Sequence, residues 1–182
     1  MIKNTKELMI RALILVLGGA LFFIFQKWFI LPAFALIWFL FEVSVNNVKN
    51  IKLLKASLTI GIILMIFDFA FENWGAIYGY WRTINSSFFV LAVPLEIMLT
   101  CIFGGAAWFL FSSKHKGKYF IAANLILWSI GGVVGEYFLI FIGFMSYSNG
   151  WLSIPHAFVS YFLTFLLFYS VSFSVIGRIN KK

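Results

Sequence analysis

The chain has 182 residues, of which 63% are hydrophobic, 21% aromatic and only 11% charged. A chain of this length cannot hide so much apolar surface inside one water-soluble globule, so its composition excludes an ordinary soluble domain. The net charge of +8 does not indicate a nucleic-acid partner, because its positions follow a membrane pattern described below. We expect a protein of the cell membrane in which residues 1–182 form a single transmembrane domain.

Apolar stretches long enough for transmembrane helices recur along the chain. Such a helix needs roughly 20 mostly apolar residues. The predicted helices cover about residues 8–26, 28–45, 56–75, 87–112, 119–145 and 152–176. The first run continues to Phe25, which favours a membrane helix over a cleaved signal peptide. The expected fold is therefore all-α, a polytopic membrane protein with six transmembrane helices.

The basic residues fall on one side of these six predicted helices. Of the 14 Lys and Arg residues, only Lys27 and Arg82 lie in the connections on the other side. Basic residues concentrate on the cytoplasmic side of membrane proteins. The pattern predicts that both termini are cytoplasmic, and that the basic clusters contact membrane lipids rather than nucleic acid.

The three prolines of the chain are almost evenly spaced. Pro32, Pro94 and Pro155 each lie near the outer start of an even-numbered predicted helix. Proline is tolerated in the first turn of a helix, where its missing N–H is not needed. This spacing is typical of repeated two-helix hairpins.

Two segments of the chain strengthen the evidence for a repeat. The segments "ENWGAIYG" and "EYFLIFIG" begin at Glu72 and Glu136 and end at Gly79 and Gly143. Each is followed by a tryptophan and then a proline. We interpret the helices as tandem helical hairpins.

Nearly all acidic residues lie inside predicted helices. The chain has 6 of them, and Glu7 is the exception. An ionisable side chain at the bilayer centre costs about 2.5–3.5 kcal/mol on insertion scales, so it usually faces a bundle interior and a partner. The candidate functional carboxylates are Glu42, Asp68, Glu72, Glu96 and Glu136.

The predicted topology places four of these acids in the outer half of the membrane. Asp68 and Glu72 share one face of the third predicted helix, because they are four residues apart. Glu96 comes well after the predicted start of the fourth helix, about 12 Å deep at roughly 1.5 Å per residue. Glu136 comes late in the fifth helix. We predict that these four residues are catalytic.

Two of the acids also have structural interpretations. Glu42 lies near the cytoplasmic end of the second predicted helix, where we expect it to snorkel or to pair with Lys49. Glu136 follows a glycine-rich stretch that lets helices approach closely. In the structural interpretation, its carboxyl group only forms a hydrogen bond between helices. This stretch contains Gly131, Gly132 and Gly135.

Aromatic and basic side chains gather near the outer helix ends. They form either an aromatic belt at the membrane interface or the lining of a pocket for a flat ligand, in which rings also attract a cation. Arg82 is either a headgroup anchor or a counter-ion for Glu72. The predicted ligand-binding residues are Tyr80, Trp81, Arg82, Trp151 and His156.

Several common catalytic motifs are absent from the sequence. It contains no GxSxG, HExxH or Walker motif and no pair of Asp-rich motifs. With two histidines and one cysteine, no metal site and no cofactor is expected. The kind of catalysis that the sequence leaves open is acid–base chemistry by carboxyl groups in apolar surroundings.

The run "DFAFENWGAIYGYW…VPLEIML" resembles the integral-membrane lycopene cyclases and the related carotenoid hydratases. The resemblance covers roughly residues 60–170. It implies a small helical protein built from tandem hairpins, with Glu96 as the first glutamate of the Pro-x-Glu motif and Asp68 or Glu72 as the acid upstream. The cyclases typically have Pro-x-Glu-Glu, whereas Ile97 follows Glu96 here.

This resemblance implies an apolar, isoprenoid-like ligand. A protonated carboxyl group would add its proton to a terminal double bond, and the cation would cyclise with loss of a proton or capture water, shielded by aromatic rings. Two other functions stay open. They are the substrate-binding subunit of a vitamin uptake transporter and a non-catalytic lipid-binding protein. A homo-oligomer or another membrane partner also stays open.

Overall fold

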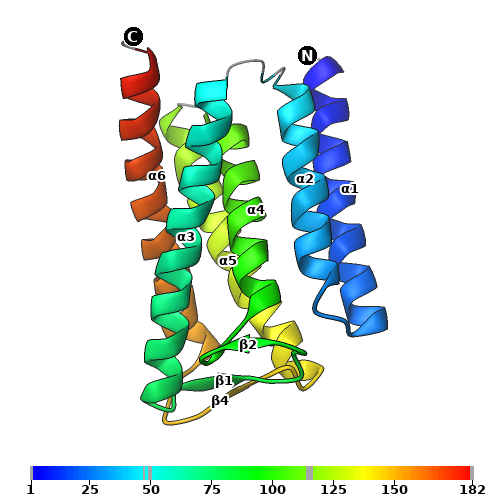
Figure 1. Ribbon diagram of the computed structural model, residues 1–182, viewed down its shortest axis with the longest axis vertical. Coiled ribbons are helices and arrows are strands. Elements are labelled where there is room, and N and C mark those ends of the chain that lie inside the picture. The colour runs from blue at the N-terminus through cyan, green and yellow to red at the C-terminus, as the bar shows by residue number, and fades with distance from the viewer. Residues whose placement is uncertain (1, 47, 49–50, 114–116, 181–182) are drawn as a thin grey trace. The chain divides into compact units, whose positions relative to one another are not determined.

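The computed structural model describes residues 2–46, 48, 51–113 and 117–180 of the chain. Most of these residues are helical (Figure 1). The helices are α1 (Ile2–Phe25), α2 (Ile30–Val45), α3 (Ile51–Ile77), α4 (Leu95–Ser112), α5 (Lys118–Phe141), a π-helical turn η1 (Ser153–Ala157) and α6 (Phe158–Asn180). The strands are β1 (Trp81–Thr83), β2 (Phe89–Val90), β3 (Val93–Pro94) and β4 (Met145–Tyr147).

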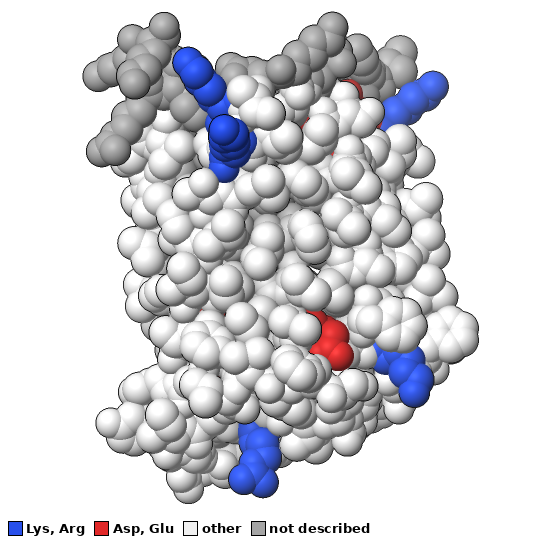
Figure 2. All heavy atoms as spheres, viewed as in Figure 1, with Lys and Arg blue, Asp and Glu red and all other residues white. Residues whose placement is uncertain are grey.

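The helices have the length and composition of membrane spans. Five are long and apolar enough to cross a bilayer: α1, α3, α4, α5, and η1 with α6. With 16 residues, α2 is shorter than the roughly 20 that a span needs. Figure 2 shows that charged side chains are sparse on the visible face. The prediction of a helical membrane-type fold is confirmed at this level.

The predicted start of the fourth helix at residue 87 is wrong. Phe89 and Val90 pair with Pro94 and Val93 in a small antiparallel hairpin, and α4 begins only at Leu95. A proline disfavours helical backbone in the residue before it, which explains why Val93 is extended. Apolar content alone does not distinguish a buried helix from short strands.

The other predicted boundaries differ by a few residues. The fifth helix ends at Phe141 instead of 145, because Gly143 has a positive φ of +74° and the chain then enters β4. At their beginnings, α1 and α3 start earlier than predicted, at Ile2 and Ile51. The sixth helix opens with the π-helical turn.

The chain forms two compact units. The first contains residues up to Asp68 together with Leu95–Phe111. Within it, α1 packs along α2, and α3 approaches α4 at Gly61. A Cβ atom on Gly61 would lie 2.0 Å from the carbonyl oxygen of Ile102, so the two backbones touch. Small residues allow such close contacts between membrane helices.

The first unit also holds a buried ion pair at Glu42. This side chain is fully buried, and its carboxylate accepts bonds from Arg11 Nε (2.5 Å), Arg11 Nη2 (3.0 Å) and Trp38 Nε1 (3.0 Å). The Arg11 guanidinium also lies over the rings of Phe41 and Phe111. Arg11 is thus a partner that we did not predict. The predicted partner, Lys49, lies outside the described residues.

The second unit contains Phe69–Pro94 and the chain from Ser112 onward. In it α5 packs against α6 and η1, and β1 pairs with β4. Of the three glycines in the predicted packing seam, Gly132 is the one that requires a close approach, because a Cβ atom there would lie 2.7 Å from the ring of Tyr161. All predicted ligand-binding residues belong to this unit.

Candidate functional site

The two repeated segments end their helices in the same way. Gly79 after α3 and Gly143 after α5 have φ of +68° and +74°, the left-handed conformation that glycine adopts without strain. The amide of the residue after each glycine donates to the carbonyl five residues earlier, at 2.8 Å from Tyr80 and 2.7 Å from Phe144. Both ends are therefore Schellman caps.

The segments that follow these caps pair with each other. Strands β1 and β4 each begin two residues after their glycine and run antiparallel (Figure 1). The register pairs Trp81 with Tyr147, Arg82 with Ser146 and Thr83 with Met145. Corresponding positions of the two repeats are thus related by a local two-fold axis at the Arg82–Ser146 pair. We call this strand pair the clasp.

Matching hydrogen bonds flank the clasp. The amide of Ile84 donates to the carbonyl of Phe144 (2.9 Å), and the amide of Ser148 donates to the carbonyl of Tyr80 (2.8 Å). In the repeat, Ile84 corresponds to Ser148 and Phe144 to Tyr80. The two-fold relation therefore extends beyond the paired residues.

An asparagine closes each repeated loop. Asn85 and Asn149 occupy equivalent positions, with φ of +62° and +49°. The Asn85 side chain donates to the carbonyl of Gly143 (3.2 Å), and the Asn149 side chain donates to that of Tyr78 (3.1 Å). Each asparagine thus contacts the helix end of the other repeat. We did not predict these two asparagines, although both stand six residues after the repeated glycine.

The inward face of the clasp holds two of the predicted catalytic carboxylates. Trp81 Nε1 donates to Glu72 at 2.9 Å, and the Tyr147 hydroxyl donates to Glu136. The Tyr161 hydroxyl from α6 donates to the other oxygen of Glu136 at 2.9 Å. Trp81 and Tyr147 face each other in the clasp, so equivalent glutamates are bound by paired aromatic residues.

The phenol of Tyr147 remains a hydrogen-bond donor. Burial raises its pKa above the usual value of 10, and the neighbouring charge of Glu136 raises it further. The hydroxyl group is therefore protonated at neutral pH and fixes the orientation of Glu136.

An aromatic cluster surrounds Trp81. Its ring, 3% exposed, lies 4.6 Å from that of Trp151 and 5.2 Å from that of Phe71. Trp151 also contacts Tyr80 at 5.5 Å and stacks on His156 at 5.2 Å. The structure thus brings together four of the predicted ligand-binding residues.

The fifth predicted ligand-binding residue, Arg82, lies on the opposite face of the clasp. Its neighbours Trp81 and Thr83 are buried, whereas Arg82 is exposed. Within the described parts of the chain, Arg82 forms no ion pair. The predicted counter-ion role for Glu72 is therefore wrong, because the strand alternation turns Arg82 away while Trp81 binds Glu72.

An open pocket of about 710 Å³ lies beside the clasp, and Trp81 and Thr83 contribute to its lining. Its lining includes Arg82 and Ser146, which face each other in the clasp, and two apolar residues of the β2–β3 hairpin, Phe89 and Leu91. The pocket lies wholly within the second unit.

Asp68 and Glu96 belong to the first unit, whereas Glu72 and Glu136 belong to the second. The helix start from which the depth of Glu96 was counted is wrong, because α4 begins at Leu95 and Glu96 lies in its first turn. A carboxylate is favoured there by the helix dipole. Asp68 is half-buried.

Among the described residues, no group of three His, Cys, Asp or Glu side chains could hold a metal ion. Comparisons of the chain with protein-family models, curated proteins and solved structures found no match. The functional interpretation therefore rests on the site itself.

Proposed function

We propose that this multi-pass protein of the cell membrane binds an apolar, isoprenoid-like ligand and cyclises or hydrates it, with Glu72 and Glu136 as the acid–base groups. The observation that carries the proposal is the position of these two glutamates. Equivalent acids from two repeats bind to facing residues of one clasp, next to a large aromatic cluster.

The proposed reaction needs only proton transfers by the protein. One protonated carboxyl group adds its proton to a terminal carbon–carbon double bond, which leaves a tertiary carbocation. In cyclisation, a second double bond attacks the cation and the ring then loses a proton to a carboxylate. In hydration, water attacks the cation and gives up a proton to the same base. Both routes leave the number of protons on the protein unchanged, and a proton transfer between the two carboxyl groups restores the starting state.

The surroundings of the two glutamates suit this chemistry. The rings of Trp81 and Trp151, whose centroids lie 4.6 Å apart, are aromatic surfaces of the kind that attracts a cation. Trp81, Tyr147 and Tyr161 orient the carboxyl groups by direct hydrogen bonds. Because these donors are already in place, the reaction does not need the reorientation of dipoles that it would need in water.

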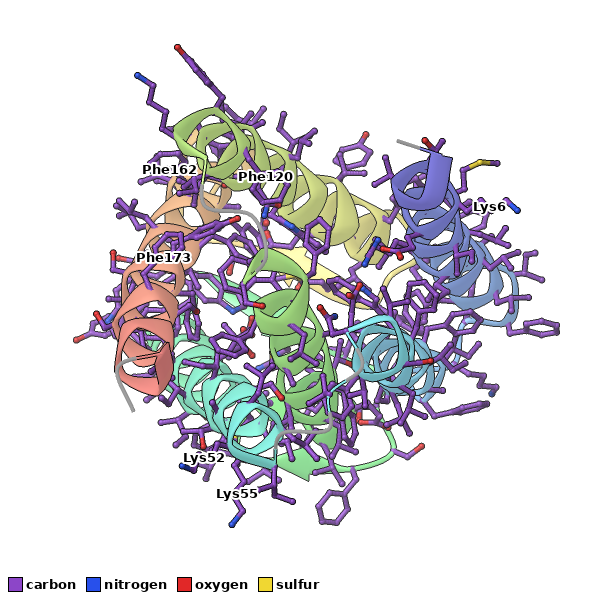
Figure 3. The ribbon with its side chains drawn as sticks, turned by 90° about the horizontal axis from the view of Figure 1, so that it is seen from above. Lys6, Lys52, Lys55, Phe120, Phe162 and Phe173 are labelled. Atoms are coloured by element: carbon purple, nitrogen blue, oxygen red, sulfur yellow. The ribbon has the colours of Figure 1, made fainter. Side chains whose placement is uncertain are left out.

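We further propose that both termini are cytoplasmic and that the clasp lies at the outer end of the helices. The distribution of basic residues supports this topology. Lys6 on α1 and Lys52 and Lys55 on α3 point away from the helices of the first unit, as contacts with anionic headgroups require (Figure 3).

Pigment analysis tests the catalytic proposal. The chain is expressed in cells that accumulate lycopene. We expect chromatography and mass spectrometry to detect a cyclised or hydroxylated product. Glu72→Gln and Glu136→Gln should each abolish it, because an amide cannot donate the required proton. Glu7→Gln is the matched control and should keep the product, since Glu7 pairs with Arg11 in the first unit.

Unchanged pigment with a folded, membrane-inserted protein would refute the catalytic proposal for this substrate. Mass spectrometry of molecules that co-purify then discriminates between the remaining functions. A retained water-soluble vitamin would support a transporter subunit, and phospholipid alone would support a lipid-binding protein.

A further inference from the structure

The pocket beside the clasp contains neither of the two glutamates of the proposed reaction. Among the described residues that line it, Arg82 is the one charged side chain. No carboxylate is present in this lining to neutralise it. The pocket is therefore a cationic site.

Polar groups around Arg82 are held in place by the loops. Ser148 and Asn85, which line the pocket, donate to the carbonyls of Gly79 and Gly143. Ser146 lies beside Arg82 on the exposed face of the clasp. The guanidinium is thus the principal donor, and its planar fork matches two oxygens of a phosphate group.

The other side of the pocket is apolar. Leu91, at the tip of the β2–β3 hairpin, is 79% exposed, and Phe89 is 38% exposed. The hairpin is tied to α3 by a 3.1 Å bond from the amide of Ala92 to Asn73. A cationic group and an exposed apolar hairpin therefore line the same pocket, as an amphiphile requires.

We propose that this pocket binds the phosphate group of an anionic amphiphile, with Arg82 on the phosphate and Phe89 and Leu91 on the start of its apolar chain. The site goes beyond the proposed reaction, since neither Glu72 nor Glu136 is among the residues that line the pocket.

Native mass spectrometry of the full chain in neutral detergent tests this site. Phosphatidylglycerol, phosphatidylcholine and inorganic phosphate are the probes. We expect preferential retention of phosphatidylglycerol, and about tenfold weaker retention by Arg82→Gln because charge-assisted hydrogen bonds are lost. Lys27→Gln is the matched control, as Lys27 is also an exposed basic residue in a connection between helices.

Two further variants keep the test decisive. Arg82→Lys retains the charge and should keep part of the preference. Leu91→Asn removes the apolar side chain while tolerating the φ of +56°, and should weaken lipid retention. The proposal would be overturned if Arg82→Gln retained as much phosphatidylglycerol as the unchanged protein, or if Lys27→Gln lost as much as Arg82→Gln. It would also be overturned if inorganic phosphate bound as tightly as the lipid and displaced it.

Discussion

At the scale of single residues, the ion pair between Glu42 and Arg11 shows how the protein accommodates a buried charge. The Glu42 side chain is fully buried, and its carboxylate accepts hydrogen bonds from Arg11 on α1, from Trp38 on α2 and from Asn46 at the C-cap of α2. Hydropathy predicted where the apolar helices lie, but not which cation pairs with Glu42. Arg11 is distant in sequence, so only the packing of α1 on α2 brings it there.

Replacing Glu42 by glutamine should strongly destabilise the protein. We expect a loss of about 3–5 kcal/mol in the free energy of unfolding, because Arg11 would keep a largely buried charge without its partner. Denaturant unfolding in detergent, followed by circular dichroism, measures the change.

Glu7→Gln provides the control for Glu42→Gln. Glu7 contacts the same arginine at 3.7 Å but is more exposed. We expect at most about 1 kcal/mol for this more exposed pair. Equal effects of the two variants would show that the buried bonds to Glu42 add no more stability than the exposed pair with Glu7.

In the candidate site, too, contacts between residues distant in the sequence could not be predicted. The repeat predicted that Glu72 and Glu136 are equivalent, but their partners Trp81 and Tyr147 become evident only in the clasp. Strands of three residues are too short to show a periodic pattern, and their pairing joins loops far apart in the chain. Glu96 was predicted to lie well after a helix start, whereas it lies in the first turn of α4. The reason is that the β2–β3 strands and the start of α4 form one continuous apolar run in the sequence.

At the scale of elements, the two helix caps offer a matched pair of glycines. Alanine at Gly79 or Gly143 should cost about 1–2 kcal/mol, because both positions have positive φ. Gly79→Ala should cost more, since its Cβ atom would lie 2.8 Å from Asn149 Nδ2 and displace the bond to Tyr78. Thermal unfolding in detergent ranks the variants.

Gly104→Ala is the control for both caps. Gly104 is helical, and a Cβ atom there meets nothing within 4 Å. This variant should be neutral or slightly stabilising, because alanine favours helix over glycine. If Gly143→Ala proved as costly as Gly79→Ala, the contact with Asn149 would not contribute.

At the scale of the whole molecule, composition was sufficient to predict helices that are long and apolar enough to cross a bilayer. Five helices have the length and apolar character of membrane spans, as the 63% hydrophobic content indicates. Composition does not set the ends of helices, which depend on local backbone such as Gly143 and Pro94.

Cysteine labelling tests the predicted topology. In a Cys101→Ala background, Ser87→Cys in the exposed loop after β1 should react with a membrane-impermeant thiol reagent on intact cells. Lys6→Cys should react only after permeabilisation, because we expect the N-terminus to be cytoplasmic. The reverse pattern would place the clasp on the cytoplasmic side.

The two-fold symmetry of the clasp makes its strands self-complementary. A single hairpin with one such loop could form the same strand pair with a second copy of itself, as in an isologous dimer. Joining two copies in one chain makes that contact intramolecular and raises its effective concentration. The two glutamates then no longer need to remain identical in their surroundings. Glu72 has a tryptophan partner and Glu136 has two tyrosine partners, a difference that a symmetric dimer of identical hairpins could not have.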